Sequence, residues 1–538
     1  MTVLAALVVS SSANAEQAGS KAQRLPFGSI DAALFHTCAI VGTGDVRCWG
    51  LGNDGRLGYE NTTTIGDTEL PDSTGPLSLG AGRKALALSA GWHHTCALLD
   101  NRTVRCWGDG SFGALGYGNT DSIGDTETVG SVGPVDLGTG RTAVQIAAGA
   151  NRTCAILDNG TVRCWGDGTS GQLGYGNPFT IGDNETPGSV GPVDLGAGRK
   201  AVAITAGQNH TCVILDNGRV RCWGIGSSGQ LGTGNADSIG DTETPASIPP
   251  VDLGAGRKAV AISAGSNHTC AILDNGKLRC WGYGGWGALG YGNTDWIGDN
   301  ELPSSVGYVS LGAGRRAVGI SGGENHTCAI LDNGQVRCWG NGFAGQLGFG
   351  GTAEIGDDEL PTAIAPVPLG AGRKAVAVSA GQNHTCALLD NGRIRCWGGS
   401  SSGQLGYGNT DSIGDNEPVT TAGFVSLGGL VKVKALPAIS LALAPRHDRT
   451  VPWRVRASGR LTGFLIDSAT CSGQVVVKAT HGRKSLVARP RVRLAAGRCS
   501  YAATLRVRSA GTWRITARFA GNGSLLARTS PARRFLAD

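Results

Sequence analysis

The 538-residue sequence has a single methionine, and only 16% of its residues are charged. Outside the first residues it has no run of 18 apolar residues, so the sequence predicts no membrane-spanning helix. Helical periodicity is also missing, while short β-branched runs broken by Gly, Asn and Asp predict an all-β protein. Acidic residues are scarce at the C-terminus, where residues 437–538 hold 3 Asp and Glu against 19 Lys and Arg.

The charge changes sign at one point in the chain. Residues 1–436 carry a net charge of −10 and residues 437–538 carry +16. This break predicts two domains, at 27–436 and 440–538. Residues 1–15 are interpreted as a signal peptide, because Val3–Val9 is apolar and Ala13-Asn14-Ala15 offers small residues for cleavage. No positive charge precedes the apolar core, so a ragged N-terminus is the alternative.

Cysteine marks an internal repeat. One series begins at Cys38 and recurs every 58 residues, and a second series with the same step begins at Cys48. Seven copies at a fixed period indicate a propeller or solenoid. Because chemistry needs one site and not seven, the repeat favours a binding scaffold over an enzyme.

Each copy predicts four antiparallel strands. In the fifth copy these are Lys258–Ser263, His268–Leu273, Lys277–Trp281 and Tyr308–Leu311. Seven such sheets predict a seven-bladed β-propeller. One chain end, Ser29–Ala32 or Val431–Leu436, is expected to complete the sheet that joins the first blade to the last.

The turn between the second and third strands sets the cysteine register. A three-residue Asp-Asn-Gly turn with a left-handed Gly places Cys270 directly opposite Cys280, in a non-hydrogen-bonded pair. We therefore predict a disulfide in every blade, each contributing about 2–3 kcal/mol. Paired cysteines suit an oxidising compartment and support export. The predicted pairs are Cys38–Cys48, Cys96–Cys106, Cys154–Cys164, Cys212–Cys222, Cys270–Cys280, Cys328–Cys338, Cys386–Cys396 and, in the second domain, Cys471–Cys499.

The repeat unit H-T-C-A-[IL]-L-D-N-G-x-V-R-C-W-G-x-G-x-x-G-x-L-G resembles the regulator of chromosome condensation repeat over about residues 27–436. The resemblance implies a seven-bladed propeller. The variety with paired cysteines and an Ile-Gly-Asp-x-Glu loop is similar to exported bacterial proteins and to ectodomains of some plant receptor kinases. Members of the family range from an exchange factor for a small GTPase to an inhibitor of secreted β-lactamases, so fold transfers and function does not.

The C-terminal domain, 440–538, is predicted to hold short strands that include Trp453–Leu461, Gln474–Thr480, Ser485–Leu494 and Thr512–Ala520. Its size and its cysteine pair suggest a basic immunoglobulin-like β-sandwich, with an unclassified β-barrel as the alternative. Its 17 Arg favour anionic partners such as cell-wall polymers or acidic polysaccharide. Alternatively, the charge only keeps the domain soluble.

Two motifs with apparent chemistry are rejected. Gly50-x-Gly52-x-x-Gly55 matches a dinucleotide fingerprint, but that motif needs a following helix, and these glycines are interpreted as turn residues. His268, Cys270 and Cys280 would give only three zinc ligands, so a disulfide beside a hydrogen-bonding histidine is preferred. We therefore predict no cofactor and no metal site.

The Ile-Gly-Asp-x-Glu loop leaves two alternatives open. Its carboxylates, such as Asp67 and Glu69, are expected to pair with the Arg before each second cysteine, or to help bind Ca²⁺. The Trp of each repeat, beginning with Trp49, is expected in the core.

Aromatic residues that break the repeat are the candidate binding residues. Trp92 stands where most other copies have Gln, Ser, Glu or Ala, Trp286 and Trp296 replace mainly Ser, and Phe343 takes the place of Gly285. We predict that Trp286, Trp296 and Phe343 cluster on one rim and bind a ligand. Packing within long loops is the alternative.

These observations predict a non-enzymatic, monomeric scaffold, secreted or at the cell surface, that binds a protein or a cell-surface glycan. Nucleic acid and a membrane span are not expected. The alternatives are a guanine-nucleotide-exchange-factor-like regulator of a small GTPase, and a secreted enzyme inhibitor.

Overall fold

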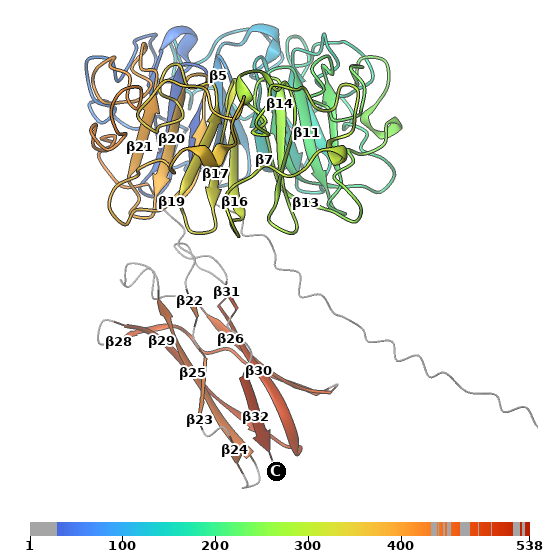
Figure 1. Ribbon diagram of the computed structural model, residues 1–538, viewed down its shortest axis with the longest axis vertical. Coiled ribbons are helices and arrows are strands. Elements are labelled where there is room, and N and C mark those ends of the chain that lie inside the picture. Colours follow the sequence, from blue (N-terminus) through green and yellow to red (C-terminus); the bar gives the residue numbers. More distant parts are fainter. Residues whose placement is uncertain are drawn as a thin grey trace, which may run out of the picture.

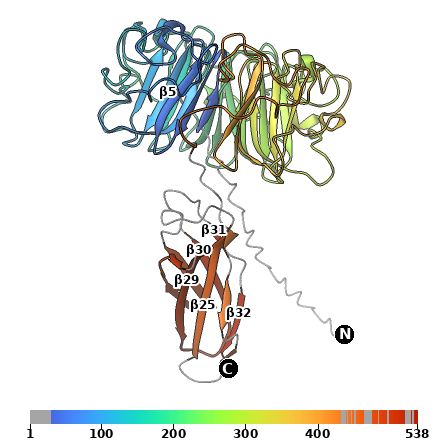
Figure 2. The same ribbon diagram turned by 90° about the vertical axis from the view of Figure 1, so that its left-hand side faces the viewer.

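The computed structural model describes residues 29–431, 438–439, 441–444, 447–448, 453–462, 474–482, 484–495, 498–519, 528–529 and 533–537. Seven sheets surround a common axis, and two further sheets form a C-terminal domain (Figures 1 and 2). The chain is thus a seven-bladed β-propeller followed by a small β-sandwich, as predicted. Helical structure in these residues is limited to short 3-10 turns, and none of them is long and apolar enough to cross a membrane.

Each blade is a three-stranded antiparallel sheet in chain order. The strands, blade by blade, are β1 (Ile30–Ala32), β2 (His36–Val41), β3 (Asp45–Gly50); β4 (Ala85–Ala90), β5 (His94–Leu99), β6 (Val104–Gly108); β7 (Ala143–Ala148), β8 (Arg152–Leu157), β9 (Val162–Gly166); β10 (Ala201–Ala206), β11 (His210–Leu215), β12 (Val220–Gly224); β13 (Ala259–Ala264), β14 (His268–Leu273), β15 (Leu278–Gly282); β16 (Ala317–Gly322), β17 (His326–Leu331), β18 (Val336–Gly340); β19 (Ala375–Ala380), β20 (His384–Leu389), β21 (Ile394–Gly398). The 3-10 turns are η1 (Asn53–Gly55), η2 (Ser111–Gly113), η3 (Pro245–Ser247), η4 (Gly285–Gly287), η5 (Pro303–Ser305) and η6 (Pro361–Ala363).

The disulfide prediction is confirmed for all seven blades. Cys270 lies opposite Cys280 with Cα atoms 4.1 Å apart, the close spacing of a non-hydrogen-bonded pair. Gly276 in the turn has φ 76°, as the three-residue loop requires. The same bond occurs in every other blade. In the second domain Cys499 is disulfide-bonded, while Cys471 lies outside the described residues.

The expected fourth strand does not form. In blade five, the Val309 N–H donates to the Leu278 carbonyl at 3.0 Å, and Ile297 makes an isolated bridge with Gly282. Between these two points the chain does not pair with β15. The prediction of a four-stranded blade at Tyr308–Leu311 was therefore wrong, because the segment meets the third strand at these two points alone.

In blade five a tyrosine hydroxyl binds the open edge of the third strand. The Tyr291 hydroxyl accepts the N–H of Cys280 at 3.0 Å and donates to the carbonyl of the same residue at 3.0 Å. Burial raises the pKa of Tyr291 to about 12, so the hydroxyl keeps its proton. The same pair of bonds occurs in blades two, three and seven. Blade six has Phe349 at this position.

Tyr291→Phe should lower the free energy of unfolding by about 1–3 kcal/mol, because both backbone groups of Cys280 lose their partner. The reverse substitution in blade six, Phe349→Tyr, introduces the hydroxyl that this blade lacks and should raise the free energy of unfolding by up to about 1 kcal/mol. Urea unfolding followed by tryptophan fluorescence measures both. A Tyr291→Phe protein as stable as the parent would mean that water replaces the hydroxyl.

Both chain ends close the ring, whereas the sequence suggested that one of them would. β1 pairs with β2 through Ile30 opposite Ala39, and it supplies one end of the innermost strand of blade one. Val431 supplies the other end, through a bridge to Val41 and an N–H bond to the Gly392 carbonyl at 2.9 Å. Residues 432–436 of the expected C-terminal strand lie outside the described residues.

The C-terminal domain contains two sheets around its own apolar core, which includes Trp513 and Phe519. In one sheet the strands lie in the order β22-β25-β29-β28, and β23 also pairs with β25. In the other sheet the order is β24-β32-β30-β26-β27, and β31 also pairs with β30. The predicted strand Ser485–Leu494 is divided between the two sheets, and Pro490 lies between its halves. The strands are β22 (Ala438–Ile439), β23 (Ala442–Ala444), β24 (His447–Asp448), β25 (Trp453–Thr462), β26 (Val475–His481), β27 (Lys484–Ala488), β28 (Arg493–Ala495), β29 (Arg498–Val507), β30 (Gly511–Phe519), β31 (Arg528–Thr529) and β32 (Arg533–Ala537).

Candidate functional site

The propeller has two ends of different character. The loop end carries the turns before each second strand and the Gly-rich loops after each third strand. The hairpin end carries the Asp-Asn-Gly turns. The candidate residues Trp92, Trp286, Trp296 and Phe343 all belong to segments of the loop end, so the loop end is the candidate site.

A ring of hydrogen bonds between blades makes the loop end rigid. His268 Nε2 lies 2.8 Å from the Thr327 hydroxyl of the next blade, and that hydroxyl donates to the Ala288 carbonyl at 2.9 Å. His268 therefore donates through Nε2. Burial lowers its pKa to about 4, which keeps the ring neutral. The pattern recurs between most neighbouring blades, and the expected hydrogen-bonding histidine is confirmed.

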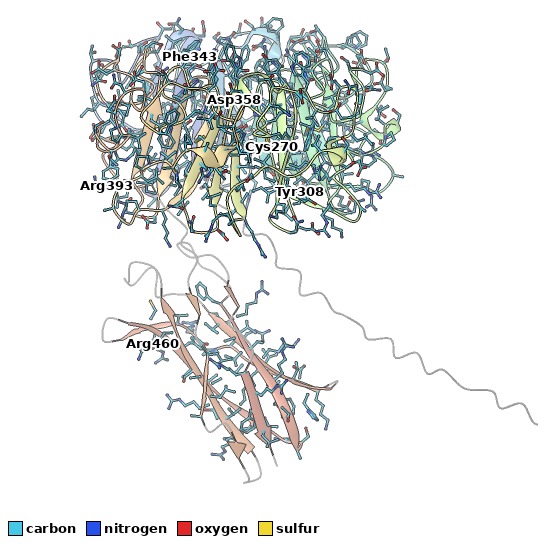
Figure 3. The ribbon with its side chains drawn as sticks, in the orientation of Figure 1. Cys270, Tyr308, Phe343, Asp358, Arg393 and Arg460 are labelled. Carbon is cyan, nitrogen blue, oxygen red and sulfur yellow. A yellow bond between two sulfur atoms is a disulfide. The ribbon has the colours of Figure 1, made fainter. Side chains whose placement is uncertain are left out.

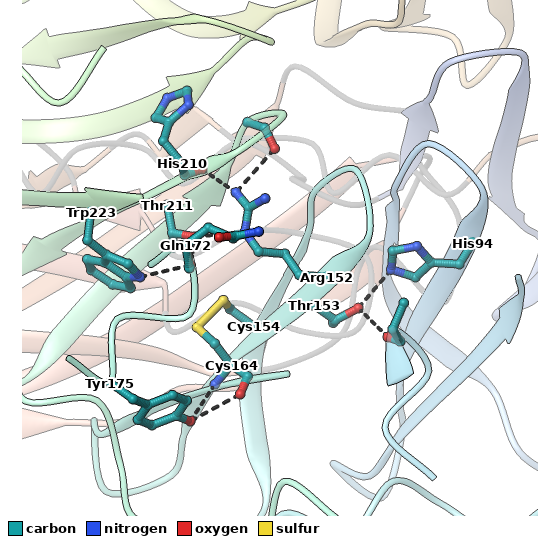
Figure 4. The surroundings of a disulfide bond; sticks show 12 residues. His94, Arg152, Thr153, Cys154, Cys164, Gln172, Tyr175, His210, Thr211 and Trp223 are labelled. Atoms are coloured by element: carbon teal, nitrogen blue, oxygen red, sulfur yellow. Dashed lines mark hydrogen bonds between the residues drawn. A yellow bond between two sulfur atoms is a disulfide. The ribbon is translucent and has the colours of Figure 1, made fainter. Parts of the chain in front are cut away.

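The boundary between blades three and four departs from this pattern. Arg152 replaces the histidine, is fully buried, and donates to the Thr211 hydroxyl at 3.1 Å (Figure 4). It also donates to the carbonyls of Gln208, at 2.6 Å, Gly207, at 3.2 Å, and His210. Burial lowers the pKa of Arg152 to about 9, which leaves the guanidinium charged at neutral pH.

The propeller axis contains a cavity of about 1860 Å³ lined by the innermost strands. A second ring of hydrogen bonds surrounds the cavity. The Ser263 hydroxyl accepts the Gly322 N–H of the next blade at 3.0 Å, and the Ser or Thr at the same position in four other blades likewise accepts a backbone N–H of the next blade. Blade three has Ala147 there, and Gln145 of the same strand makes a different bond to the next blade by donating to the Ile204 carbonyl at 3.1 Å. Neighbouring blades are thereby joined by side chains at two levels.

Blade one carries a carboxyl in this second ring. Asp31 accepts the Ala90 N–H at 2.9 Å and the Ser379 hydroxyl at 2.9 Å. Burial raises its pKa to about 6, against the lowering effect of these bonds. Sequence reasoning missed this residue; its position in the seven-fold register, where the other copies have Ser, Thr or Ala, was the available signal.

The repeated Arg does not pair with the Ile-Gly-Asp-x-Glu carboxylates, so that hypothesis was wrong. Arg279 donates to the carbonyls of Pro303 and Val306, the latter at 2.6 Å, and every blade repeats this use of carbonyl acceptors. Glu301 instead accepts the Gly298 N–H at 3.1 Å within its own loop. The loop carboxylates therefore stabilise turns.

The structure places the candidate aromatic residues in two separate regions. Trp92 is half-buried and lines the axial cavity. Trp286 is 43% exposed, Trp296 41% and Phe343 60%, and none of the three lines that cavity. Figure 3 shows Phe343 at the loop end, away from Tyr308.

The predicted clustering on one rim stays a prediction. Trp296 packs edge-on against Tyr283, with ring centroids 5.3 Å apart. Among residues 29–431, no ring contact joins Trp286, Trp296 and Phe343. The repeated Trp, in contrast, are fully buried, as expected.

The Gly-rich loops take two conformations, and one side chain decides between them. In blade four the Gln230 Oε1 accepts the Ser228 N–H at 2.8 Å, and the Gln of blades three, six and seven does the same. In blade five Ala288 stands in place of Gln, and its own N–H donates to the Gly285 carbonyl at 3.2 Å to form η4. The peptide is flipped, and Trp286 has φ 61°.

Trp286 is therefore held in a left-handed conformation that a bulky residue adopts at a cost of about 1–2 kcal/mol. Phe112 in blade two has φ 60° for the same reason, since Ala114 replaces Gln. Both rings remain about half exposed, so packing inside the chain only partly offsets the strain. Strain combined with exposure is a feature of functional loops. The Ala-for-Gln exchange was the sequence signal for this conformation.

The fold and the loop end define a disulfide-braced propeller with surface loops of variable sequence. Two protein-family models, both described as the regulator of chromosome condensation (RCC1) repeat, match the chain. The first matches at residues 29–56, 86–114, 143–172, 201–230, 259–285, 317–346 and 375–404. The second matches at residues 159–214, 275–330 and 333–388. The chain belongs to the RCC1 repeat family.

Three proteins illustrate the similarity. The Ultraviolet-B receptor UVR8 of Arabidopsis thaliana is 30% identical over 394 residues, which are 72% of this chain and 80% of UVR8. The mitochondrial RCC1 domain-containing protein RUG3 of Arabidopsis thaliana is 30% identical over 328 residues, 61% of this chain and 68% of RUG3. The crystal structure of Prp20p from Saccharomyces cerevisiae matches with a TM-score of 0.54 at 22% identity, covering 71% of this chain and 88% of Prp20p.

Proposed function

We propose that the protein is an exported binding scaffold that captures a protein or glycan partner at or near the cell surface through the loop end of its propeller. The observation that carries the proposal is the exposure of aromatic side chains on the loops of this end, above all the strained Trp286. Seven disulfides indicate an oxidising environment and support export.

The relatives support protein binding as the more general activity. Prp20p, which shares the fold, is described by its binding properties to Gsp1p and histones. A guanine-nucleotide-exchange-factor-like regulator and a secreted enzyme inhibitor are therefore the alternative forms of the same scaffold. Cytosolic protein with thiols that alkylate without reductant would favour the first; capture of an enzyme from culture medium would favour the second.

Trp286→Ser with Trp296→Ser should weaken partner capture at least about 30-fold, since aromatic anchors often contribute 2 kcal/mol or more each. Partners are identified by pull-down and a glycan array with the parent protein, and affinity is then measured by calorimetry. Ser stands at both positions in another copy of the repeat, so the melting temperature should change little.

Two further variants sharpen this test. Ala288→Gln should restore the Gln-capped loop and weaken capture while keeping the Trp286 ring. Tyr308→Pro is the matched control, because it removes an exposed aromatic residue from the same blade and restores the Pro of five other copies. Unchanged capture by the double Trp variant, or an equal loss with Tyr308→Pro, would place the binding site elsewhere.

A further inference from the structure

We infer that the C-terminal β-sandwich binds a linear anionic polysaccharide on the exposed, arginine-bearing faces of its sheets. This inference concerns the second domain and does not depend on the aromatic loop end. The domain was already conspicuous in the sequence for its charge. The structure adds how those charges are arranged.

Arginines stand directly opposite one another on neighbouring strands. Arg514 of β30 faces Arg534 of β32, and Arg454 of β25 faces Arg506 of β29. All four side chains are exposed, and they alternate with buried residues such as Ile515. Like charges at directly opposed positions destabilise a sheet. The six-stranded sheet keeps such a pair, Arg514 and Arg534, on its exposed face, which suits an anionic partner better than the stability of the sheet.

The six-stranded sheet extends its pair into a larger basic face. Arg518 lies on the same face of β30 as Arg514, two positions beyond Thr516, and Lys478 of β26 lies opposite Thr516. Arg518 and Lys478 are exposed. Four cations thus occupy neighbouring positions on three adjacent strands.

No acidic side chain neutralises this face within the described part of the domain. Asp448, at the edge strand β24, is the one acidic residue among the described positions after 431. Within those positions, the four cations of the six-stranded sheet make no ion pair.

The spacing of the face suits a polymer with regularly repeated charges. Opposed residues lie about 4.5–5.5 Å apart and alternate residues of a strand about 7 Å apart. Guanidinium groups bind carboxylate and sulfate through two parallel hydrogen bonds. The disulfides indicate an oxidising environment, which favours a polysaccharide over an intracellular nucleic acid as the polyanion.

The test uses the full-length protein with polygalacturonate, dextran sulfate and neutral dextran as probes. We expect both charged polymers to bind and neutral dextran not to bind. Arg514→Thr with Arg534→Thr should raise the dissociation constant at least about 10-fold, and the dependence of log K on log salt concentration should become shallower, as fewer counterions are released. The melting temperature should stay the same or rise, because the opposed charges are gone.

Two comparisons separate this site from general charge attraction. Lys200→Gln with Lys258→Gln removes the same charge from the propeller and should change binding less than two-fold. Arg514→Lys with Arg534→Lys keeps the charge but loses the paired hydrogen bonds. Its dissociation constant should lie between those of the parent and the Thr variant. Three results would overturn the inference. The propeller lysine variant could lose as much affinity as the Thr variant, the Thr variant could bind as tightly as the parent, or the parent could bind double-stranded DNA as tightly as the charged polysaccharides. Trp286→Ser with Trp296→Ser should bind polyanion normally, so the two proposals fail separately.

Discussion

Arg152→Ala is expected to lower the free energy of unfolding by about 3 kcal/mol or more. The substitution leaves the carbonyls of Gly207 and Gln208 without their donor at the boundary between two blades, while the His210 carbonyl keeps the Gly207 N–H at 2.8 Å. Each unsatisfied buried acceptor costs about 1–3 kcal/mol. The same boundary lacks the Ser hydroxyl of the axial ring, because blade three has Ala147, and Gln145 joins the two blades there instead.

Arg152→His is the matched control. It restores the residue type of the other copies, and the introduced imidazole would reach the Thr211 hydroxyl as His210 reaches Thr269, at 2.8 Å. It also removes a desolvated cation. We expect a change within about 1 kcal/mol. Denaturant unfolding of both variants measures the difference. If the Ala and His substitutions destabilise the protein equally, the imidazole does not take over the role of Arg152. If Arg152→Ala is as stable as the parent, the carbonyl bonds of Arg152 contribute little.

Asp31→Ser is expected to stabilise the protein by about 2–3 kcal/mol at pH 8. Asp31 has a pKa of about 6 in the folded protein against 3.8 for the free side chain, so folding favours its protonated form. Below pH 3.8 the carboxyl is protonated in both the folded and the unfolded chain, so it does not lower the free energy of unfolding. As the pH rises from 3.8 to about 6, the unfolded chain loses this proton more readily than the folded protein, and the free energy of unfolding falls. Ser at this position acts in other blades as acceptor for the next blade, so the bond from Ala90 should be kept.

The pH dependence distinguishes this explanation from a general gain. The difference in melting temperature between Asp31→Ser and the parent should be largest at pH 8 and shrink at pH 4. Asp31→Asn removes the charge at the same size and should show the same pH trend. A stabilisation by Ser that is equal at both pH values would show that the carboxyl is not the cause.

The disulfide register could be predicted because it is local. Cys270 and Cys280 are ten residues apart, and the three-residue turn between their strands leaves one pairing that brings the sulfurs together. The buried Trp and His followed from their repetition in the copies. The missing fourth strand could not be predicted from strand propensity, since it depends on how the long loop returns to the blade: it meets β15 at Ile297 and Val309 and does not pair between them.

The candidate site was only partly predictable. Trp286, Trp296 and Phe343 were identified as departures from the repeat, and the structure exposes all three. The flip of the Trp286 loop escaped notice, because it follows from Ala288 lacking an acceptor that Gln provides in other blades. The acceptors of Arg279 were likewise misassigned, since carbonyls of a turn compete with carboxylates that local N–H groups already engage.

The sequence by itself determined the number of blades, the paired cysteines and the opposite charges of the two domains, because these depend on period, on short turns and on composition. Tertiary structure alone decided that both chain ends share the first blade, that Gln145 bonds the Ile204 carbonyl of the next blade, and that Arg514 faces Arg534. These features join residues that are far apart in the chain or belong to different blades. Their partners are set by which donors and acceptors the packed blades and sheets bring within reach.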